Sequence, residues 1–204
     1  MLYLTTVGSK SVGMNAYVQD KPELAYLKDV EFKQSDVVQT LIKCENGELI
    51  SLKLDTTMPR YYSREMVVRG TKAYYNMENK CVYTDDDWTK EGVDGVLKPN
   101  HWYKSEERFY DYLPEIWKNV TEEIIKQGHG GMDYFEFLYF AECLKNGKEM
   151  PVDVYDAASW MSITYLSEQS MKNNGQPIEI PDFTRGKYKT REQKDVVELP
   201  VIKK

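Results

Sequence analysis

Apolar and polar side chains alternate along residues 37–44 and again along residues 48–55, which is the pattern of strands with one buried face. Residues 45–47 separate the two runs, and their Asn-Gly pair favours the positive φ angles of a tight turn. The two runs therefore predict an antiparallel hairpin. Further strands are predicted at residues 2–7, 63–70, 73–77 and 80–84.

The second half of the chain has the period of helices. Apolar side chains recur at helical spacing in residues 105–126, with an interruption near Pro114, and in residues 132–145 and 152–172. The two later runs each end at an Asn-Gly pair, which accepts the left-handed conformation of a helix cap. We expect three helices here.

Shorter features fill the remaining stretches. Residues 8–13 are typical of a loop, residues 22–30 of a short helix, and residues 177–181, which lie between two prolines, of an edge strand. Residues 85–105 lack a period and predict a surface connection. The charged residues after Gly186 are expected to be loose.

Strands that precede helices indicate an α+β fold, a mostly antiparallel open sheet with helices packed on one face. With 204 residues the chain fits one domain, which we place at residues 1–188, followed by a charged tail at residues 189–204. The other face of such a sheet must pack against another protein surface.

Composition narrows the function classes. A net charge of -6 and a pI near 5.1 argue against a nucleic-acid partner. No apolar run reaches the roughly 20 residues of a membrane span, so no membrane partner is expected, and the first residues lack the features of a signal peptide. The location stays open: cytoplasmic, or exported if a signal precedes these residues.

Metal and disulfide chemistry have little support in the sequence. Cys44, Cys81 and Cys143 are far apart and show no paired spacing, so we expect small buried side chains and no metal site. The acidic residues 85–87 offer oxygen ligands, but contiguous carboxylates usually form a solvated face. The Gly-rich residues 128–131 lack the spacing and the strand–turn–helix setting of a dinucleotide fingerprint, so no cofactor-binding residue is assigned.

Several blocks agree in order and wording with one known family. They are residues 36–47, 55–63, 128–134, 153–160 and 181–186. This set resembles the carboxyl-terminal domain of the Gfo/Idh/MocA oxidoreductase superfamily and, within it, the NAD-dependent glycosidases of glycoside hydrolase family 109, which are alpha-N-acetylgalactosaminidase-like. The resemblance extends from about residue 7 to residue 187. Two departures are Tyr61, where the family usually has proline, and Ala73, where a second glycine is common.

The resemblance implies a partner domain and a cofactor. In the family, NAD oxidises the sugar transiently, which permits elimination of the aglycone, and it is held by a Rossmann domain that precedes the part seen here. NAD is therefore not expected to bind this chain alone. The resemblance also implies a carbohydrate substrate, the missing Rossmann domain as a partner, and a homo-oligomer formed through the open sheet face.

Two residues are the candidates for substrate binding. By resemblance, Tyr62 reaches the sugar site from the end of a strand, where a phenol can stack on a sugar ring and hydrogen-bond a hydroxyl; packing at a sheet edge, with Tyr61 in its role, is the alternative. His129 lies at a glycine-bounded helix start and either donates to a substrate oxygen or caps the helix. Arg60 and Arg64 either bind a carboxylate or brace the loop.

Other marked residues are expected to be structural. Asp153 is placed as the N-cap of the last helix, with Asp156 in the first turn. Asp182 and Arg185 are expected to pair with each other. Residues of the last helix that we expect in the core are Trp160, Met161, Ile163, Leu166 and Met171.

The sequence therefore predicts the substrate-binding and oligomerisation domain of an NAD-dependent glycosidase, inactive without its cofactor domain. Two alternatives remain. One is a non-catalytic module that self-associates or binds sugar, and the other is the equivalent domain of a sugar or inositol dehydrogenase.

Overall fold

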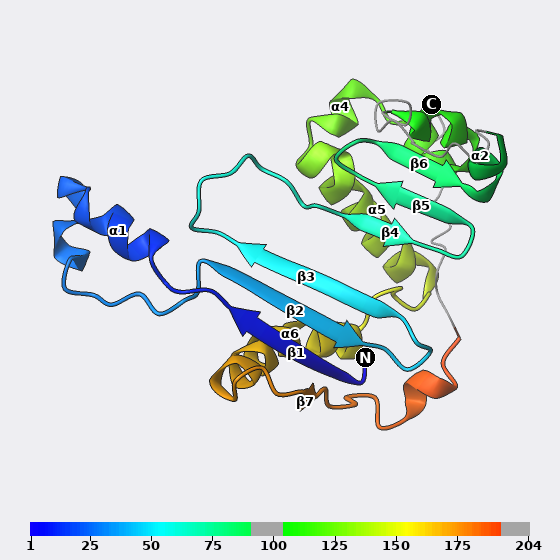
Figure 1. The fold of residues 1–204 in the computed structure, drawn as a ribbon. Coiled ribbons are helices and arrows are strands. Elements are labelled where there is room, and N and C mark those ends of the chain that lie inside the picture. The colour runs from blue at the N-terminus through cyan, green and yellow to red at the C-terminus, as the bar shows by residue number, and fades with distance from the viewer. Residues whose placement is uncertain (91–103, 193–204) are drawn as a thin grey trace. The chain divides into compact units, whose positions relative to one another are not determined.

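The computed structural model describes residues 1–90 and 104–192 (Figure 1). The chain divides into two compact units. Within the described residues, unit 1 consists of residues 1–60 and 150–192, and unit 2 of residues 61–90 and 104–149. Each unit has its own sheet and its own helices.

Unit 1 contains a four-stranded sheet in the order β3-β2-β1-β7. Its strands are β1 (Tyr3–Gly8), β2 (Val37–Lys43), β3 (Leu49–Asp55) and β7 (Ile178–Glu179). All the pairs are antiparallel, and the predicted hairpin is confirmed, with Val37 opposite Asp55 and Lys43 opposite Leu49. Gly47 in the turn has a φ of 105°. The predicted edge strand is β7, shorter than expected.

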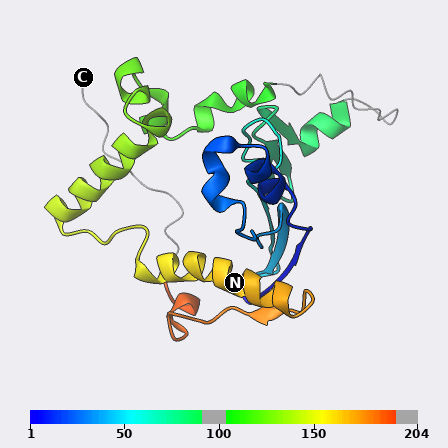
Figure 2. The same ribbon diagram turned by 90° about the vertical axis from the view of Figure 1, so that its left-hand side faces the viewer.

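The helix α6 (Val154–Lys172) covers one face of this sheet (Figures 1 and 2). Leu4 and Ile42 from the sheet pack with Leu166 from the helix and with Ile180. Asp153 is the N-cap, and it forms a capping box with Asp156, as predicted.

The contact between α6 and the sheet also contains buried hydroxyl groups. The Ser170 hydroxyl accepts a hydrogen bond from the Thr6 backbone N–H at 2.9 Å and donates one to the Gln176 carbonyl at 2.7 Å. Thr6 bonds Thr40 at 2.9 Å, and Thr40 bonds Ser167 at 3.3 Å. These small side chains let the helix approach the strands closely while every hydroxyl finds a partner.

Two of the predicted core residues of this helix are exposed. Trp160 is 56% and Met161 is 74% exposed, whereas Leu166 is 8% exposed. Because one residue advances about 100° around a helix, Met161 lies about 140° away from Leu166, too far to share its face. The apolar set of this helix is wider than the face that the sheet covers.

The start of unit 1 also differs from the prediction. A helix α1 (Gly13–Gln19), which was not expected, follows the loop, and the predicted helix of residues 22–30 is a shorter 3-10 helix, η1 (Pro22–Leu27). The Asp36 carboxylate accepts hydrogen bonds from the N–H groups of Val12 and Gly13, both at 2.8 Å. A long-range contact of this kind leaves no local signal in the sequence.

Unit 2 begins with a three-stranded antiparallel sheet in the order β4-β5-β6. The strands are β4 (Val67–Arg69), β5 (Ala73–Asn76) and β6 (Cys81–Thr84). The strand predicted from residue 63 starts only at Val67. The described strands therefore form two sheets, where the sequence suggested one.

Helices complete unit 2. The connection predicted from residue 85 opens with helix α2 (Asp85–Lys90), and residues 91–103 of that connection lie outside the described residues. The predicted helix of residues 105–126 breaks into η3 (Ser105–Tyr112), α3 (Glu115–Lys118) and α4 (Glu122–Ile125). The next predicted helix is confirmed as α5 (Met132–Asn146), preceded by the 3-10 turn η4 (His129–Gly131). Ile116, Ile124 and Phe135 form the core.

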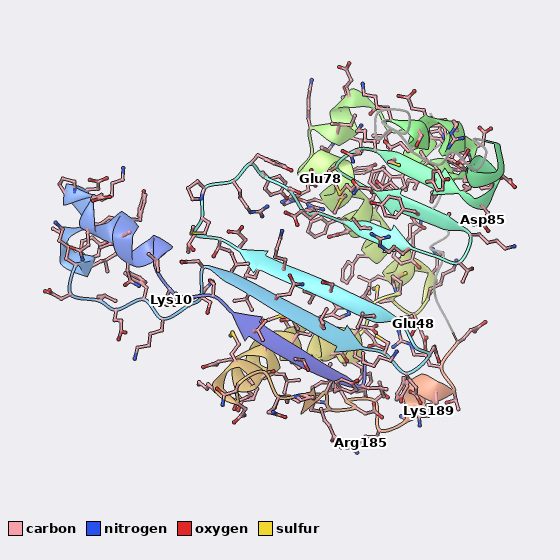
Figure 3. All side chains as sticks on the ribbon, viewed as in Figure 1. Lys10, Glu48, Glu78, Asp85, Arg185 and Lys189 are labelled. Atoms are coloured by element: carbon pink, nitrogen blue, oxygen red, sulfur yellow. The ribbon has the colours of Figure 1, made fainter. Side chains whose placement is uncertain are left out.

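The segment after Gly186 is more ordered than predicted as far as it is described. It forms the 3-10 helix η5 (Lys187–Lys189), and Figure 3 shows Lys189 at the end of the sheet that carries Glu48, whereas Lys10 lies at the opposite end. Arg191 pairs with the capping-box carboxylates of α6, at 3.1 Å from Asp153 and 3.0 Å from Asp156. These contacts tie the segment to unit 1.

Asp182 does not form the expected pair with Arg185. Its carboxylate accepts hydrogen bonds from the backbone N–H groups of Thr184 and Gly186 and from the Thr184 hydroxyl. The carboxylate therefore shapes a local turn.

The α+β class with antiparallel strands is confirmed. Among the described residues, no helix is long and apolar enough to cross a bilayer.

Candidate functional site

The start of α5 has an unusual backbone. Gly128, His129, Gly130 and Gly131 all have positive φ angles, of 91°, 42°, 71° and 95°. Glycine adopts such angles at little cost, but His129 does so against its own preference. A strained residue inside a glycine run marks a segment whose geometry is fixed by the surrounding structure.

Two of these glycines are also required by close contacts. A Cβ atom at Gly128 would lie 2.3 Å from an Asp133 carboxylate oxygen, and one at Gly131 would lie 3.0 Å from Ile124. The Gly-rich sequence thus brings the turn against both the first turn of α5 and the end of α4.

His129 is oriented by Asp133. Its Nδ1 atom lies 2.9 Å from one oxygen of the Asp133 carboxylate and 3.0 Å from the other. The imidazole is 69% and the carboxylate 41% exposed. Because the carboxylate favours a proton on Nδ1, the Nε2 atom is left as the ring nitrogen that can face a ligand.

The alternative role that the sequence left for His129, capping of the helix, is wrong. Gly131 is the N-cap of α5, and no side chain makes a cap hydrogen bond there. The imidazole contacts a side chain of the first turn instead of its backbone N–H groups.

Tyr62 lies in the loop that joins β3 to β4, beyond the end of the strand where the family resemblance placed it. It is 81% exposed, and Tyr61 beside it is 75% exposed. The Tyr62 hydroxyl accepts a hydrogen bond from Arg64 Nε at 3.1 Å. The ring is therefore presented to solvent, not packed at a sheet edge.

The loop around Tyr62 is anchored by its neighbour. Ser63 is 7% exposed, and its hydroxyl donates to Glu78 at 2.5 Å and accepts from the Glu65 N–H at 2.9 Å. Glu78 is labelled in Figure 3, in the turn between β5 and β6. An anchor one residue away restricts where the tyrosine ring can lie.

The two candidate arginines brace the chain. Arg60 Nε lies 3.3 Å from the Asp55 carbonyl oxygen and 3.8 Å from its carboxylate, and Arg64 contacts Tyr62.

Tyr62 and His129 both belong to unit 2. Within the residues that the structure describes, no hydrogen bond joins these two side chains.

The three aspartates of residues 85–87 differ in their exposure to solvent. Asp85 and Asp86 are exposed, but Asp87 is only 3% exposed. Its carboxylate receives two hydrogen bonds from the Arg108 guanidinium, at 2.8 and 3.0 Å, and two from Thr84. The Arg108 bonds lower the pKa of Asp87 to about 2 against the opposing effect of burial.

This carboxylate therefore anchors α2 and is not part of an open ligand set. In the described part of the chain, no three His, Cys, Asp or Glu side chains are grouped as metal ligands would be.

Sequence reasoning missed two partners in unit 2. The short spacing of four residues between His129 and Asp133, across the glycine turn, is the signal that could have found their contact. The contact of Asp87 with Arg108 has no comparable signal, because 21 residues separate them.

The comparisons with known proteins agree with each other. The family model described as "Glycosyl hydrolase 109, C-terminal domain" matches residues 1–190. A "Glycosyl hydrolase family 109 protein" of Stenotrophomonas maltophilia (strain K279a) is 40% identical over 162 residues, which are 79% of this chain and 34% of that protein.

Two relatives carry the name "Alpha-N-acetylgalactosaminidase". The protein from Tannerella forsythia is 35% identical over 92% of this chain and 38% of its own length. The protein from Shewanella oneidensis is 32% identical over 91% of this chain and 40% of its own length. The chain thus spans about two fifths of the length of the curated relatives that it matches.

Proposed function

The chain belongs to the glycoside hydrolase 109 family, of which it is the C-terminal domain, and on this premise we propose that it is the substrate-side part of an α-N-acetylgalactosaminidase. The observation that carries the proposal is the family match over residues 1–190, together with relatives of that name at 35% and 32% identity. In this proposal the enzyme has a second domain, and the greater length of the matched relatives supports it.

In this proposal Tyr62 and His129 bind the sugar. An exposed phenol can stack on the apolar face of a pyranose ring while its hydroxyl bonds a sugar hydroxyl. His129 has one ring nitrogen held by Asp133, so the other can exchange a hydrogen bond with a substrate oxygen. The anchored loop and the glycine-bounded turn give both residues a restricted position.

NAD, the proposed cofactor, is assigned to the missing domain. It would supply the reversible oxidation of the sugar. Support for this assignment comes from the strand pairs, which are all antiparallel in the described ranges, whereas the fingerprint turn for a dinucleotide connects parallel strands through a helix. The side chains of this chain would bind and orient the sugar against that cofactor.

Self-association through the open face of the unit 1 sheet is part of the same proposal. The face turned away from α6 presents apolar side chains on neighbouring strands: Tyr3 and Val7 on β1, Leu41 on β2 and Leu49 on β3 are 42–64% exposed. A second copy would cover this face and form an isologous contact, the commonest kind in homo-oligomers.

The test is a hybrid protein. This chain is joined to the amino-terminal part of the Tannerella forsythia α-N-acetylgalactosaminidase that lies outside the match, and hydrolysis of an α-linked N-acetylgalactosaminide is measured with NAD. We expect hydrolysis by the hybrid and none by the chain alone. Calorimetry should show NAD binding to the hybrid and none to the chain.

Point variants of the hybrid test the two site residues. Tyr62→Phe should lower kcat/KM about tenfold and His129→Ala about 10- to 100-fold, the size expected for one lost hydrogen bond to substrate. Tyr61→Phe is the matched control and should change kcat/KM less than about twofold. Oxidation of free sugar without hydrolysis would favour a dehydrogenase, and an inactive hybrid that binds NAD and sugar would favour a binding module.

A further inference from the structure

Helix α6 has a second apolar face. Val154 is 71%, Met161 74% and Tyr165 63% exposed, although the opposite side of the helix packs on the sheet. Met161 and Tyr165 are one turn apart and lie on the same side of the helix. Large apolar side chains in such a row signal a contact surface.

A groove continues this surface toward the edge of the sheet. It lies between α6 and β3 and has a volume of about 910 Å³. Leu52 and Leu54 pair with the buried residues Thr40 and Val38, so they point to the same face of the sheet as α6. They are nevertheless 39% and 49% exposed, because α6 packs mainly over β1.

The rim of the groove carries more positive than negative charge. Lys33, Lys53 and Lys172 line it, and Glu168 is the one acidic side chain among its lining residues. Glu168 is already bridged to Lys172 at 2.5 Å, and Lys33 is paired with Glu31 at 3.5 Å, so these side chains leave an excess of one positive charge. An occupant with carboxylates beside an apolar strip would match this rim.

We propose that this face of unit 1 is the docking surface for an amphipathic helix of the second domain, the part that in the relatives lies outside the match. The occupant would insert apolar side chains over Leu52 and Leu54 and rest on Met161 and Tyr165. Its flanking acidic residues would face the lysines. The inference rests on the proposed function, which requires a second domain.

A polypeptide fits the surface better than a small molecule. The volume alone is within the range of ligand pockets, but the apolar row of α6 extends the surface beyond any such site. A helix in a groove makes use of both parts. The relatives supply the occupant, since about three fifths of their length lies outside the match.

The experiment compares thiol labelling in the chain alone and in the hybrid with the Tannerella forsythia domain. Cys44→Ser removes the one cysteine that is partly exposed, because Cys81 and Cys143 are buried. Single cysteines are then introduced as Met161→Cys and Leu52→Cys. Leu41→Cys, on the opposite face of the sheet, is the matched control.

We expect maleimide labelling at positions 161 and 52 to be fast in the chain alone and at least about tenfold slower in the hybrid, where the linked domain acts at an effective concentration of about millimolar. The ratio at position 41 should stay near one. Slow labelling of positions 161 and 52 in the chain alone would mean that its own residues or a second copy cover the surface. That result, or equal rates in chain and hybrid, would overturn the proposal.

The readout is independent of catalysis. A hybrid that is protected at positions 161 and 52 but lacks hydrolysis would refute the proposed activity and leave the docking surface intact. A hybrid that hydrolyses substrate without such protection would refute the docking surface alone.

Discussion

At the scale of single residues, buried polar groups hold the chain together at points where sequence neighbours would suggest a solvated surface. Asp87 is the clearest case, since it follows two exposed aspartates and is itself buried against Arg108. Ser170 is another, because it is completely buried on a helix with many polar residues.

Asp87→Asn should lower the free energy of unfolding by about 2 kcal/mol at pH 7, since it weakens charge-assisted hydrogen bonds to Arg108. Urea denaturation measures this. Asp85→Asn is the control in the same helical turn, is exposed, and should change stability by less than about 0.5 kcal/mol. Equal losses in both variants would contradict the assigned role.

The same carboxylate predicts a pH dependence. Its pKa is about 2 in the folded chain and near 3.9 in an unfolded one, so it is depressed by folding. The stabilisation is fully present above pH 4 and is lost as the pH falls toward 2. The difference in stability between the native chain and Asp87→Asn should therefore shrink over this window, as followed by urea titrations at each pH.

Ser170→Ala should cost about 1–3 kcal/mol, because it leaves the buried N–H of Thr6 without its acceptor. Ser159→Ala is a matched control on the same helix, since the Ser159 hydroxyl bonds only the preceding turn at Tyr155. It should cost less than about 0.5 kcal/mol. Thermal unfolding followed by circular dichroism distinguishes the two variants. A loss of stability in Ser159→Ala as large as that in Ser170→Ala would contradict the role assigned to the Ser170 hydroxyl.

At the scale of elements, the sequence predicted what local patterns determine. The hairpin, α5 and α6 have a clear period and recognisable ends, and Asp153 could be assigned as a cap from its position alone. Elements that depend on distant partners could not be predicted. The helix α1 begins where Asp36 binds its first N–H groups, and α2 is fixed by Arg108.

The candidate site shows the same division. Glycines on both sides of His129 predicted an unusual helix start, but not that the imidazole would turn to Asp133. The position of Tyr62 depends on Ser63 and its contact with Glu78, which residue type alone does not reveal. For Met161 the helical spacing was right, but the buried side of the helix was not, since spacing does not tell which partner covers which face.

The turn before α5 gives a prediction at this scale. Gly131→Ala should lower the free energy of unfolding by about 2–4 kcal/mol, because a Cβ atom there is strained by the positive φ and also meets Ile124 at 3.0 Å. Gly147→Ala, at the other end of the same helix, has a positive φ but open space around its Cβ position and should cost about 1–2 kcal/mol. Chemical denaturation provides the comparison, and equal costs would mean that the contact with Ile124 has no effect.

At the scale of the whole molecule, unit 1 presents two different apolar faces, one on each side of its sheet. The α6 side is a groove with a basic rim, whereas the open side is a set of strand residues without a helix over them. We have proposed a second domain as the partner of the first face and another copy of the chain as the partner of the second. The two assignments predict opposite responses to the same kind of substitution.

Leu41→Glu places a carboxylate on the open face and should weaken self-association at least about tenfold, because in an isologous contact each copy brings its own charge into the interface. Leu52→Glu places the same charge in the groove, on the neighbouring strand, and should leave self-association unchanged. Sedimentation velocity over a concentration series measures both. If Leu52→Glu weakened self-association and Leu41→Glu did not, the copies would meet through the groove. The open face of the sheet would then be the one left for the second domain.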